Sequence, residues 1–119
     1  MTRVFVYGTL KTGGENHRYL AGQRLLGAAS TTEGYTLFSL GDYPGMVRSG
    51  GPGRQVLGEL WEVDDACLRA LDELEGVAEG LYERVPVALQ PPFASVPAET
   101  YLYRRSIAGR RELGPAWPA

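Results

Sequence analysis

Glycine and proline interrupt this chain too often for a bundle of long helices. The 119 residues include 16 glycines and 8 prolines, and both residue types favour turns over the interiors of helices and strands. The apolar runs between them are short and rich in β-branched and aromatic residues, which is typical of buried strands. The sequence therefore predicts many short strands joined by turns.

Several segments have the apolar character of strands, and the longest is expected to bulge or bend at Gly27 and Gly34. The prolines before the last segment exclude that connection from the centre of a sheet. The expected segments are residues 3–6, 24–40, 46–47, 55–63, 81–89 and 100–104. Five to six short strands, one main helix and a helical turn at residues 16–20 predict an α+β protein with a small barrel-like sheet.

The main helix is expected at residues 65–75. The acidic pair Asp64 and Asp65 supplies an N-cap and a favourable charge in the first turn, and Gly76 ends the helix. A projection at about 100° per residue places Glu75 inside the apolar stripe and Glu73 outside it. The stripe consists of Cys67, Leu68, Leu71 and Leu74.

Glu75 is a candidate general acid and base. Removing a carboxylate from water raises its pKa unless a cation offsets the effect, and a glutamate with a near-neutral pKa can both accept and return a proton. The alternative is a frayed helix end at which Glu75 simply reaches water. Glu73 is expected to be a solvated carboxylate near Arg69.

Composition and charge narrow the possible functions. Hydrophobic residues make up 44% and charged residues 22%, and the net charge is −2 without a basic block, so nucleic-acid binding has little electrostatic support. No apolar run approaches the ~20 residues that span a bilayer, and we expect neither a signal peptide nor a membrane partner. The single cysteine, Cys67, excludes an internal disulfide and fits a reducing compartment.

We therefore expect a cytoplasmic protein with one domain at residues 1–105 and a tail at residues 106–119. The tail either packs a tryptophan on the domain or is disordered. The sequence does not indicate the oligomeric state.

The turn after the first strand is a second candidate site. The run Val4-Phe5-Val6 ends at Tyr7-Gly8-Thr9-Leu10, and Gly8 permits a backbone turn that a residue with a Cβ would resist. Backbone N–H groups that leave the ladder here must bind water, side chains or a ligand. We expect this turn to hold a small anionic or carbonyl-bearing substrate. Tyrosines that can line a pocket beside it are Tyr7, Tyr43, Tyr82 and Tyr103.

Three other kinds of site are poorly supported. The glycines at positions 8 and 13 have the spacing of a phosphate-binding loop, but Gly14 and Glu15 follow where that motif needs a lysine and a serine or threonine. A nucleophilic pair of Cys67 and His17 competes with the ordinary roles of a core cysteine and a surface histidine. One histidine and one cysteine make no zinc pattern, and the acidic residues near the helix end project in different directions, so no metal is expected.

Several short motifs occur in an order and spacing that span roughly residues 3–105. They are Tyr7-Gly8-Thr9-Leu10, Asn16-His17, Tyr43-Pro44-Gly45, Leu71-Asp72-Glu73-Leu74-Glu75-Gly76 and Leu81-Tyr82-Glu83-Arg84. Together they resemble the gamma-glutamylcyclotransferase-like superfamily, in particular its AIG2-like and gamma-glutamylamine cyclotransferase branch.

The resemblance implies a small mixed β-barrel with flanking helices. It also implies release of 5-oxoproline from a small gamma-glutamyl amine or gamma-glutamyl amino acid, without a metal or cofactor. The acid/base role falls on Glu75 and substrate binding on Tyr7, Gly8, Thr9 and Leu10. Further pocket walls would be Tyr43, Pro44, Tyr82 and Tyr103.

Two alternatives to this activity stay open. One is a protein that binds a gamma-glutamyl-like or amine ligand in the same pocket without turnover. The other is an enzyme that removes a gamma-glutamyl group from a specialised substrate in a biosynthetic pathway.

Overall fold

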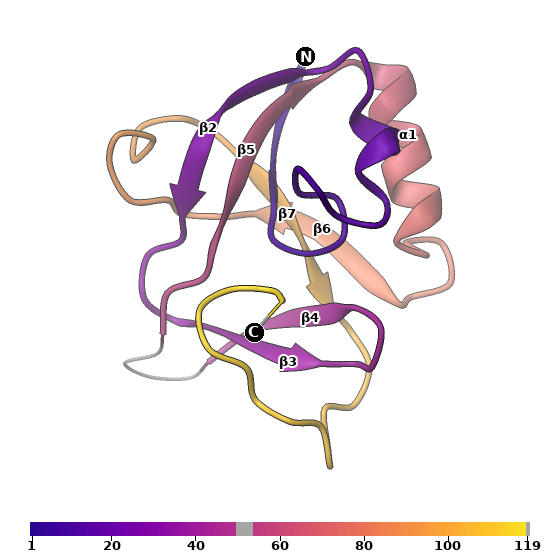
Figure 1. Ribbon diagram of the computed structural model, residues 1–119, viewed down its shortest axis with the longest axis vertical. Helices are drawn as coiled ribbons and strands as arrows, with labels where there is room; N and C mark the ends of the chain where they lie inside the picture. The colour runs from indigo at the N-terminus through magenta and orange to yellow at the C-terminus, as the bar shows by residue number, and fades with distance from the viewer. Residues whose placement is uncertain (50–53, 119) are drawn as a thin grey trace.

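Two β-sheets and one main helix make up the described part of the chain. The computed structural model describes residues 1–49 and 54–118, with a five-stranded sheet in the order β2-β5-β1-β7-β6 and a separate pair, β3-β4 (Figure 1). The elements are β1 Thr2–Val6, the short 3-10 helix η1 His17–Leu20, β2 Arg24–Ser30, β3 Tyr35–Ser39, β4 Pro44–Arg48, β5 Leu57–Val63, α1 Asp65–Leu74, β6 Tyr82–Pro86 and β7 Glu99–Tyr103.

β1 lies at the centre of the larger sheet. It pairs antiparallel with β5 and parallel with β7, so the sheet is mixed, as the resemblance implies. Side chains alternate between the two faces of a strand, and here Phe5 enters one apolar cluster whereas Val4 and Val6 enter the other. The strand β1, which was predicted to be buried, therefore lies between two apolar clusters and contributes side chains to both.

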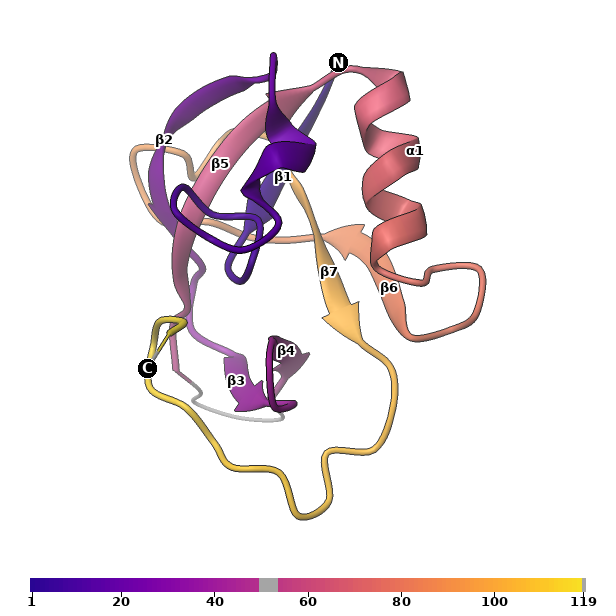
Figure 2. The same ribbon diagram turned by 45° about the vertical axis from the view of Figure 1, so that its right-hand side comes forward.

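The helix α1 covers one face of the larger sheet (Figure 2). Its N-cap is Asp64, whose Oδ1 accepts the backbone N–H of Cys67 at 2.8 Å. After the last helical residue, Gly76 has a φ of +64°, the left-handed conformation that favours glycine at this position. The predicted apolar stripe is confirmed, because all four members belong to the cluster between helix and sheet: Cys67, Leu68, Leu71 and Leu74.

The predicted barrel is not present in residues 1–49 and 54–118. The strand-like segment 24–40 divides into β2 and β3, which belong to different sheets. The predicted irregularity at Gly27 is confirmed by a shift of the β2–β5 register beside it, and Gly34 turns the chain with a φ of +111°. Because such a turn interrupts a strand, the described chain has seven strands in two sheets, where five to six in one barrel were expected.

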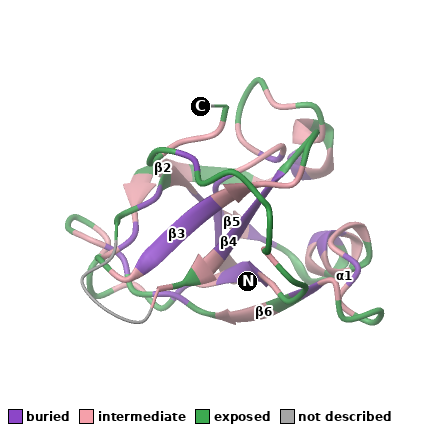
Figure 3. Ribbon diagram, turned by 90° about the horizontal axis from the view of Figure 1, so that it is seen from below, coloured by how far each residue is buried: buried purple, intermediate pink, exposed green. Residues whose placement is uncertain are grey.

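Of the two alternatives for the tail, the structure shows packing for residues 106–118. The N–H of Ser39 donates to the carbonyl of Arg111 at 2.8 Å, and the N–H of Leu113 donates to the carbonyl of Leu37 at 2.7 Å. Leu113 is 3% exposed, and Trp117 is partly buried against the same core. The strand that receives the tail, β3, is itself largely buried (Figure 3).

The glycine-rich composition of residues 49–53 predicts a loop, and residues 50–53 of it lie outside the described residues. Neither helix in the described ranges has the length and apolar character needed to cross a bilayer.

Candidate active site

A cavity of about 340 Å³ lies where the end of β1, the β3–β4 turn, the end of α1 and the strands β6 and β7 meet. Every residue that the sequence analysis proposed for the site lines this cavity, except Tyr103. The lining residues among that set are Tyr7, Gly8, Thr9, Leu10, Tyr43, Pro44, Glu75 and Tyr82. The fold thus brings a loop at a strand end and a carboxylate at a helix end into one space.

The loop of residues 7–10 is held from behind by Asn16. The backbone N–H of Asn16 donates to the carbonyl of Thr9 at 2.9 Å, and its side-chain Nδ2 donates to Thr9 Oγ1 at 3.0 Å. Within the described ranges, the backbone N–H groups of Gly8, Thr9 and Leu10 donate no hydrogen bond. Because these residues line the cavity, their N–H groups are the candidate donors for a carboxylate or carbonyl oxygen of a substrate.

Close packing, and not backbone conformation, requires a glycine at position 8. Gly8 is not among the glycines with a positive φ, so a left-handed backbone conformation is not what makes a Cβ unfavourable here. A Cβ on this residue would lie 2.8 Å from Cγ of Pro44, well inside normal carbon–carbon contact. The loop 7–10 therefore rests directly on the first residue of β4.

Glu75 is the cap residue that follows α1, and it lines the cavity. Burial raises the pKa of its carboxyl from the ordinary 4.5 to about 7, because apolar surroundings disfavour the charged form. The helix end is not frayed, since the N–H of Glu75 donates to the carbonyl of Leu71 at 2.9 Å. Glu73 is exposed, as the helical projection predicts.

Three buried tyrosines line the same cavity as Glu75 without donating to it. Each gives its hydroxyl proton to another acceptor: Tyr7 to the carbonyl of Tyr101 at 2.6 Å, Tyr82 to the carbonyl of Pro44 at 2.7 Å, and Tyr101 to Oδ1 of Asp72 at 2.7 Å. Burial is the main reason that the pKa of each of these phenols is raised, and the charge of Glu75 contributes to all three. The phenols therefore stay protonated at neutral pH.

Comparison with known proteins identifies the family to which this chain belongs. The family model described as gamma-glutamyl cyclotransferase, AIG2-like, matches residues 4–118. The chain belongs to this family.

The relatives cover most of the chain. The gamma-glutamylcyclotransferase family protein YtfP of Escherichia coli K12 is 38% identical over 107 residues, which are 90% of this chain and 87% of that protein. The gamma-glutamylaminecyclotransferase of Bos taurus is 38% identical over 107 residues, which are 84% of this chain and 63% of the bovine protein. The solution structure of ytfP from Escherichia coli has a TM-score of 0.73 at 34% identity, covering 98% of this chain and 96% of that one.

In this AIG2-like protein, Tyr101 lines the cavity and Tyr103 does not. Tyr103 lies beside the cavity, edge-on to Tyr82, with ring centroids 5.4 Å apart. Residues two apart on a strand share a face. Alternation along β7 therefore places both tyrosines on the same face, but it does not say which one reaches the cavity. Sequence reasoning therefore missed Tyr101, and it missed Asn16 as a site residue although the motif Asn16-His17 contained the signal.

The alternative pair of Cys67 and His17 does not form. The thiol of Cys67 donates to the carbonyl of Tyr19 at 3.4 Å, and burial raises the pKa of this thiol. The Nδ1 atom of His17 lies 3.0 Å from the carbonyl oxygen of Leu10, and its ring packs edge-on against Trp61. Both side chains support the AIG2-like fold around the site.

The charged residues that line the cavity are all acidic, namely Glu15, Asp42 and Glu75. Glu15 and Asp42 are exposed, so they lie toward solvent. No lysine, arginine or histidine of the described ranges lines the cavity. A negative substrate group therefore meets only neutral donors there, such as the backbone N–H groups of the loop 7–10, whereas a positive group meets carboxylates.

Proposed function

We propose that this protein is a gamma-glutamyl cyclotransferase that releases 5-oxoproline from a gamma-glutamyl amine or gamma-glutamyl amino acid. The observation that carries the proposal is that Glu75 shares one cavity with the unpaired N–H groups of the loop 7–10. The first supplies proton transfer, and the second supplies donors for developing negative charge. Membership of the AIG2-like family supports the same reaction.

Glu75 is the general base and the general acid. As a carboxylate it takes a proton from the α-ammonium of the substrate, and the freed amine attacks the gamma carbonyl carbon. A C–N bond closes the five-membered ring, and the C–N bond to the other amine breaks. The attacking nitrogen loses two protons in all, and Glu75 relays protons to the departing amine, which leaves as an ammonium ion at neutral pH.

The loop 7–10 holds the glutamyl group. Its N–H groups bind the α-carboxylate or polarise the gamma carbonyl, and the tyrosine walls keep the chain folded over the ring-closing geometry. Because ring closure is intramolecular, good alignment alone can lower the barrier by about 7–11 kcal/mol. This scheme uses no metal and no cofactor.

The test is 5-oxoproline release by the wild type and by Glu75→Gln. The amide keeps the size of the side chain but cannot accept the proton, so we expect release to fall at least about a hundredfold for every accepted substrate. Retained turnover in Glu75→Gln would reject the role of Glu75.

Glu73→Gln is the matched control, because Glu73 lies on the same helix but is exposed. It should retain most of the activity. A comparable loss in both variants would mean that the wrong glutamate has been assigned.

A panel of substrates separates this proposal from its alternatives. Gamma-glutamylamines, gamma-glutamyl dipeptides and glutathione are incubated with the protein while 5-oxoproline is detected. Binding without product would favour a non-catalytic ligand-binding protein. If the protein neither binds nor converts any member of the panel, a specialised substrate in a biosynthetic pathway is favoured.

The acidic lining of the cavity favours amines over amino acids as the second part of the substrate. A gamma-glutamyl amino acid carries a second carboxylate, which would approach Glu15 and Asp42, and like charges repel. We therefore expect higher kcat/KM for a gamma-glutamylamine than for a gamma-glutamyl dipeptide of similar size. Equal values would show that the acidic residues do not discriminate.

A further inference from the structure

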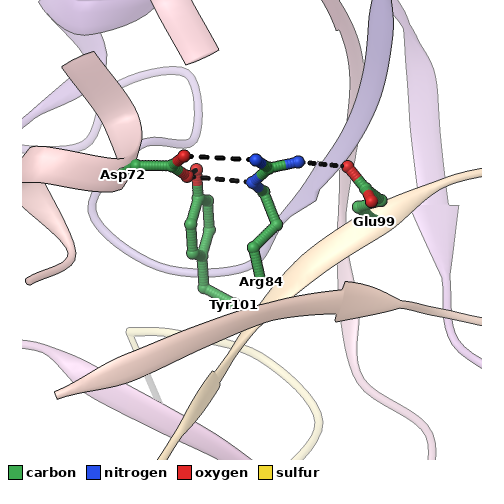
Figure 4. Close-up of polar contacts among 4 residues, drawn as sticks. All are labelled: Asp72, Arg84, Glu99 and Tyr101. Carbon is green, nitrogen blue, oxygen red and sulfur yellow. Dashed lines mark hydrogen bonds and ion pairs between the residues drawn. The ribbon is translucent and has the colours of Figure 1, made fainter. Parts of the chain in front are cut away.

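An ionic cluster joins the last turn of α1 to β6 and β7 beside the cavity (Figure 4). Arg84 on β6 donates to both carboxylate oxygens of Asp72, from Nε at 2.9 Å and from Nη2 at 3.2 Å, and its Nη1 donates to Oε1 of Glu99 at 2.6 Å. Two parallel bonds between a guanidinium and a carboxylate fix both groups. Asp72 stands three residues before Glu75, so the cluster also fixes the turn from which Glu75 projects.

Tyr101 connects this cluster with the cavity. Its side chain lines the cavity, and its hydroxyl donates to Oδ1 of Asp72 at 2.7 Å. Its carbonyl accepts the hydroxyl of Tyr7 at 2.6 Å. Tyr101 lies opposite Arg84 in the β6–β7 ladder, so the two side chains reach Asp72 from neighbouring strands.

The direction of the tyrosine protons matters for Glu75. A phenol has one proton to donate, and Tyr7, Tyr82 and Tyr101 all donate it elsewhere. Over residues 1–49 and 54–118, no side chain donates to the Glu75 carboxyl, and burial alone accounts for its raised pKa. A donated hydrogen bond would stabilise the carboxylate and lower that pKa.

We propose that Asp72, held by Arg84, is a positioning residue for the reaction, because it binds the Tyr101 hydroxyl and keeps it from donating to Glu75. The carboxyl of Glu75 then stays without a protein partner until the ammonium group of the substrate arrives. The inference rests on the proposed function, in which Glu75 both takes and returns a proton.

The titratable groups around Glu75 come from every element that surrounds the cavity. Of the three phenols that are not bound to Asp72, Tyr7 and Tyr82 donate to backbone carbonyls and Tyr43 is exposed. The other carboxyls of the lining, Glu15 and Asp42, are exposed as well. These groups are Tyr7 after β1, Glu15 before η1, Asp42 and Tyr43 in the β3–β4 turn, Asp72 on α1, Tyr82 on β6 and Tyr101 on β7. Tyr101 is the one among these phenols whose proton is held by a side chain, so it is the one that a single substitution can release.

The test is a carbon-13 NMR titration of the Glu75 carboxyl in the ligand-free protein, which measures its pKa without turnover. Asp72→Ala suits a helix and removes the acceptor, so the Tyr101 hydroxyl becomes free to turn to Glu75. We expect the pKa of Glu75 to fall by about one unit. In Asp72→Ala/Tyr101→Phe at least half of that fall should be recovered, because only the electrostatic effect of losing the Asp72 charge beside Arg84 remains.

Two single variants complete the experiment. Glu73→Ala removes an exposed carboxylate from the adjacent position on the helix, and it should leave the pKa of Glu75 nearly unchanged because exposed charges are screened. Tyr101→Phe should also leave it unchanged. A rise of the pKa in Tyr101→Phe would show that Tyr101 already donates to Glu75, and this result would overturn the proposal even if Asp72→Ala did not fold.

If the pKa of Glu75 falls equally in Asp72→Ala and in the double variant, the proposal is also overturned, because the Tyr101 hydroxyl would then have no part in the shift. Release of 5-oxoproline by the same proteins is measured separately. A wild type without product rejects the proposed function, whereas the titration pattern tests the effect of Asp72 on Glu75 by itself. With turnover present, the acid limb of kcat/KM should move to lower pH in Asp72→Ala and return toward the wild-type position in the double variant.

Discussion

At the scale of the residue, the raised pKa of Glu75 that suits the proposed proton transfer also lowers the stability of the folded protein at neutral pH. Its pKa is raised from 4.5 to about 7 in the folded protein. Between these values the folded protein binds a proton that the unfolded chain has already lost, so the free energy of unfolding decreases as the pH rises. The contribution is constant below the unfolded pKa and is fully lost above the folded pKa.

We expect the wild type to become less stable than Glu75→Gln as the pH rises from about 5 to about 8, by up to about 3 kcal/mol. The amide does not titrate, so the difference between the two proteins isolates this carboxyl from all others. Urea unfolding at several pH values measures it. A difference that is independent of pH would mean that Glu75 has an ordinary pKa in the folded protein.

Under the proposed function, the same carboxyl sets the pH dependence of the reaction. Because only the carboxylate accepts a proton, kcat/KM for 5-oxoproline release should fall about tenfold per pH unit below a pKa of about 7. A pH–rate profile with a gamma-glutamylamine measures this limb. A plateau that continues down to about pH 5 would contradict general-base catalysis by a residue of this pKa.

At the scale of the element, the site depends on how closely the loop 7–10 packs on β4. Gly8 touches the ring of Pro44, and the carbonyl of Pro44 accepts the hydroxyl of Tyr82 at 2.7 Å. Loop, strand β4 and strand β6 are thereby joined around the cavity. A displacement at any one of these contacts changes the distance between the N–H donors and Glu75.

Gly8→Ala should therefore reduce both the activity and the stability of the protein. The added methyl group, 2.8 Å from Cγ of Pro44, forces the loop and the proline apart. We expect kcat/KM to fall roughly 10–100-fold and the free energy of unfolding to fall by about 1–3 kcal/mol. Steady-state kinetics and urea unfolding measure the two effects.

Gly114→Ala is the matched control, because a Cβ at this position has no atom within 4 Å and its φ is not positive. It should leave both quantities close to those of the wild type. Equal activity in the two alanine variants would show that the loop absorbs the methyl group without moving its donors.

At the scale of the whole molecule, the end of the chain completes the core. Leu113 belongs to the apolar cluster that also contains Phe5 and Leu37. Backbone bonds attach the tail to β3 and to the start of β5, where the N–H of Leu57 donates to the carbonyl of Pro115 at 2.7 Å. The N-terminal strand and the C-terminal tail thus share one core.

Leu113→Ala should lower the free energy of unfolding by about 2–5 kcal/mol, since it leaves a cavity beside a fully packed cluster. Leu25→Ala is the control, because Leu25 is 46% exposed, and its effect should stay below about 1 kcal/mol. Urea unfolding compares the two. An equally small effect at Leu113 would mean that the tail contributes little to stability.

Local patterns were sufficient for much of the fold. The strand at β1, the helix with its Asp64 cap and its end before Gly76, and the irregularity at Gly27 follow from periodicity and backbone preference over a few residues. The same local periodicity distinguished Glu75 from Glu73. It did not separate β2 from β3 into different sheets, because that depends on which partners the two segments find elsewhere in the chain.

The sequence by itself determined the types and approximate limits of the elements, and it identified the loop 7–10 and Glu75 as candidates, since each is encoded by neighbouring residues. Only the tertiary structure decided that Tyr101 lines the cavity and Tyr103 does not. It also decided that position 8 needs a glycine because Pro44 leaves no room for a Cβ, and that Asp72 binds the Tyr101 hydroxyl. The physical reason is that hydrogen bonds and close contacts join side chains far apart in sequence. Their geometry is set by strand register and helix packing, which no local pattern specifies.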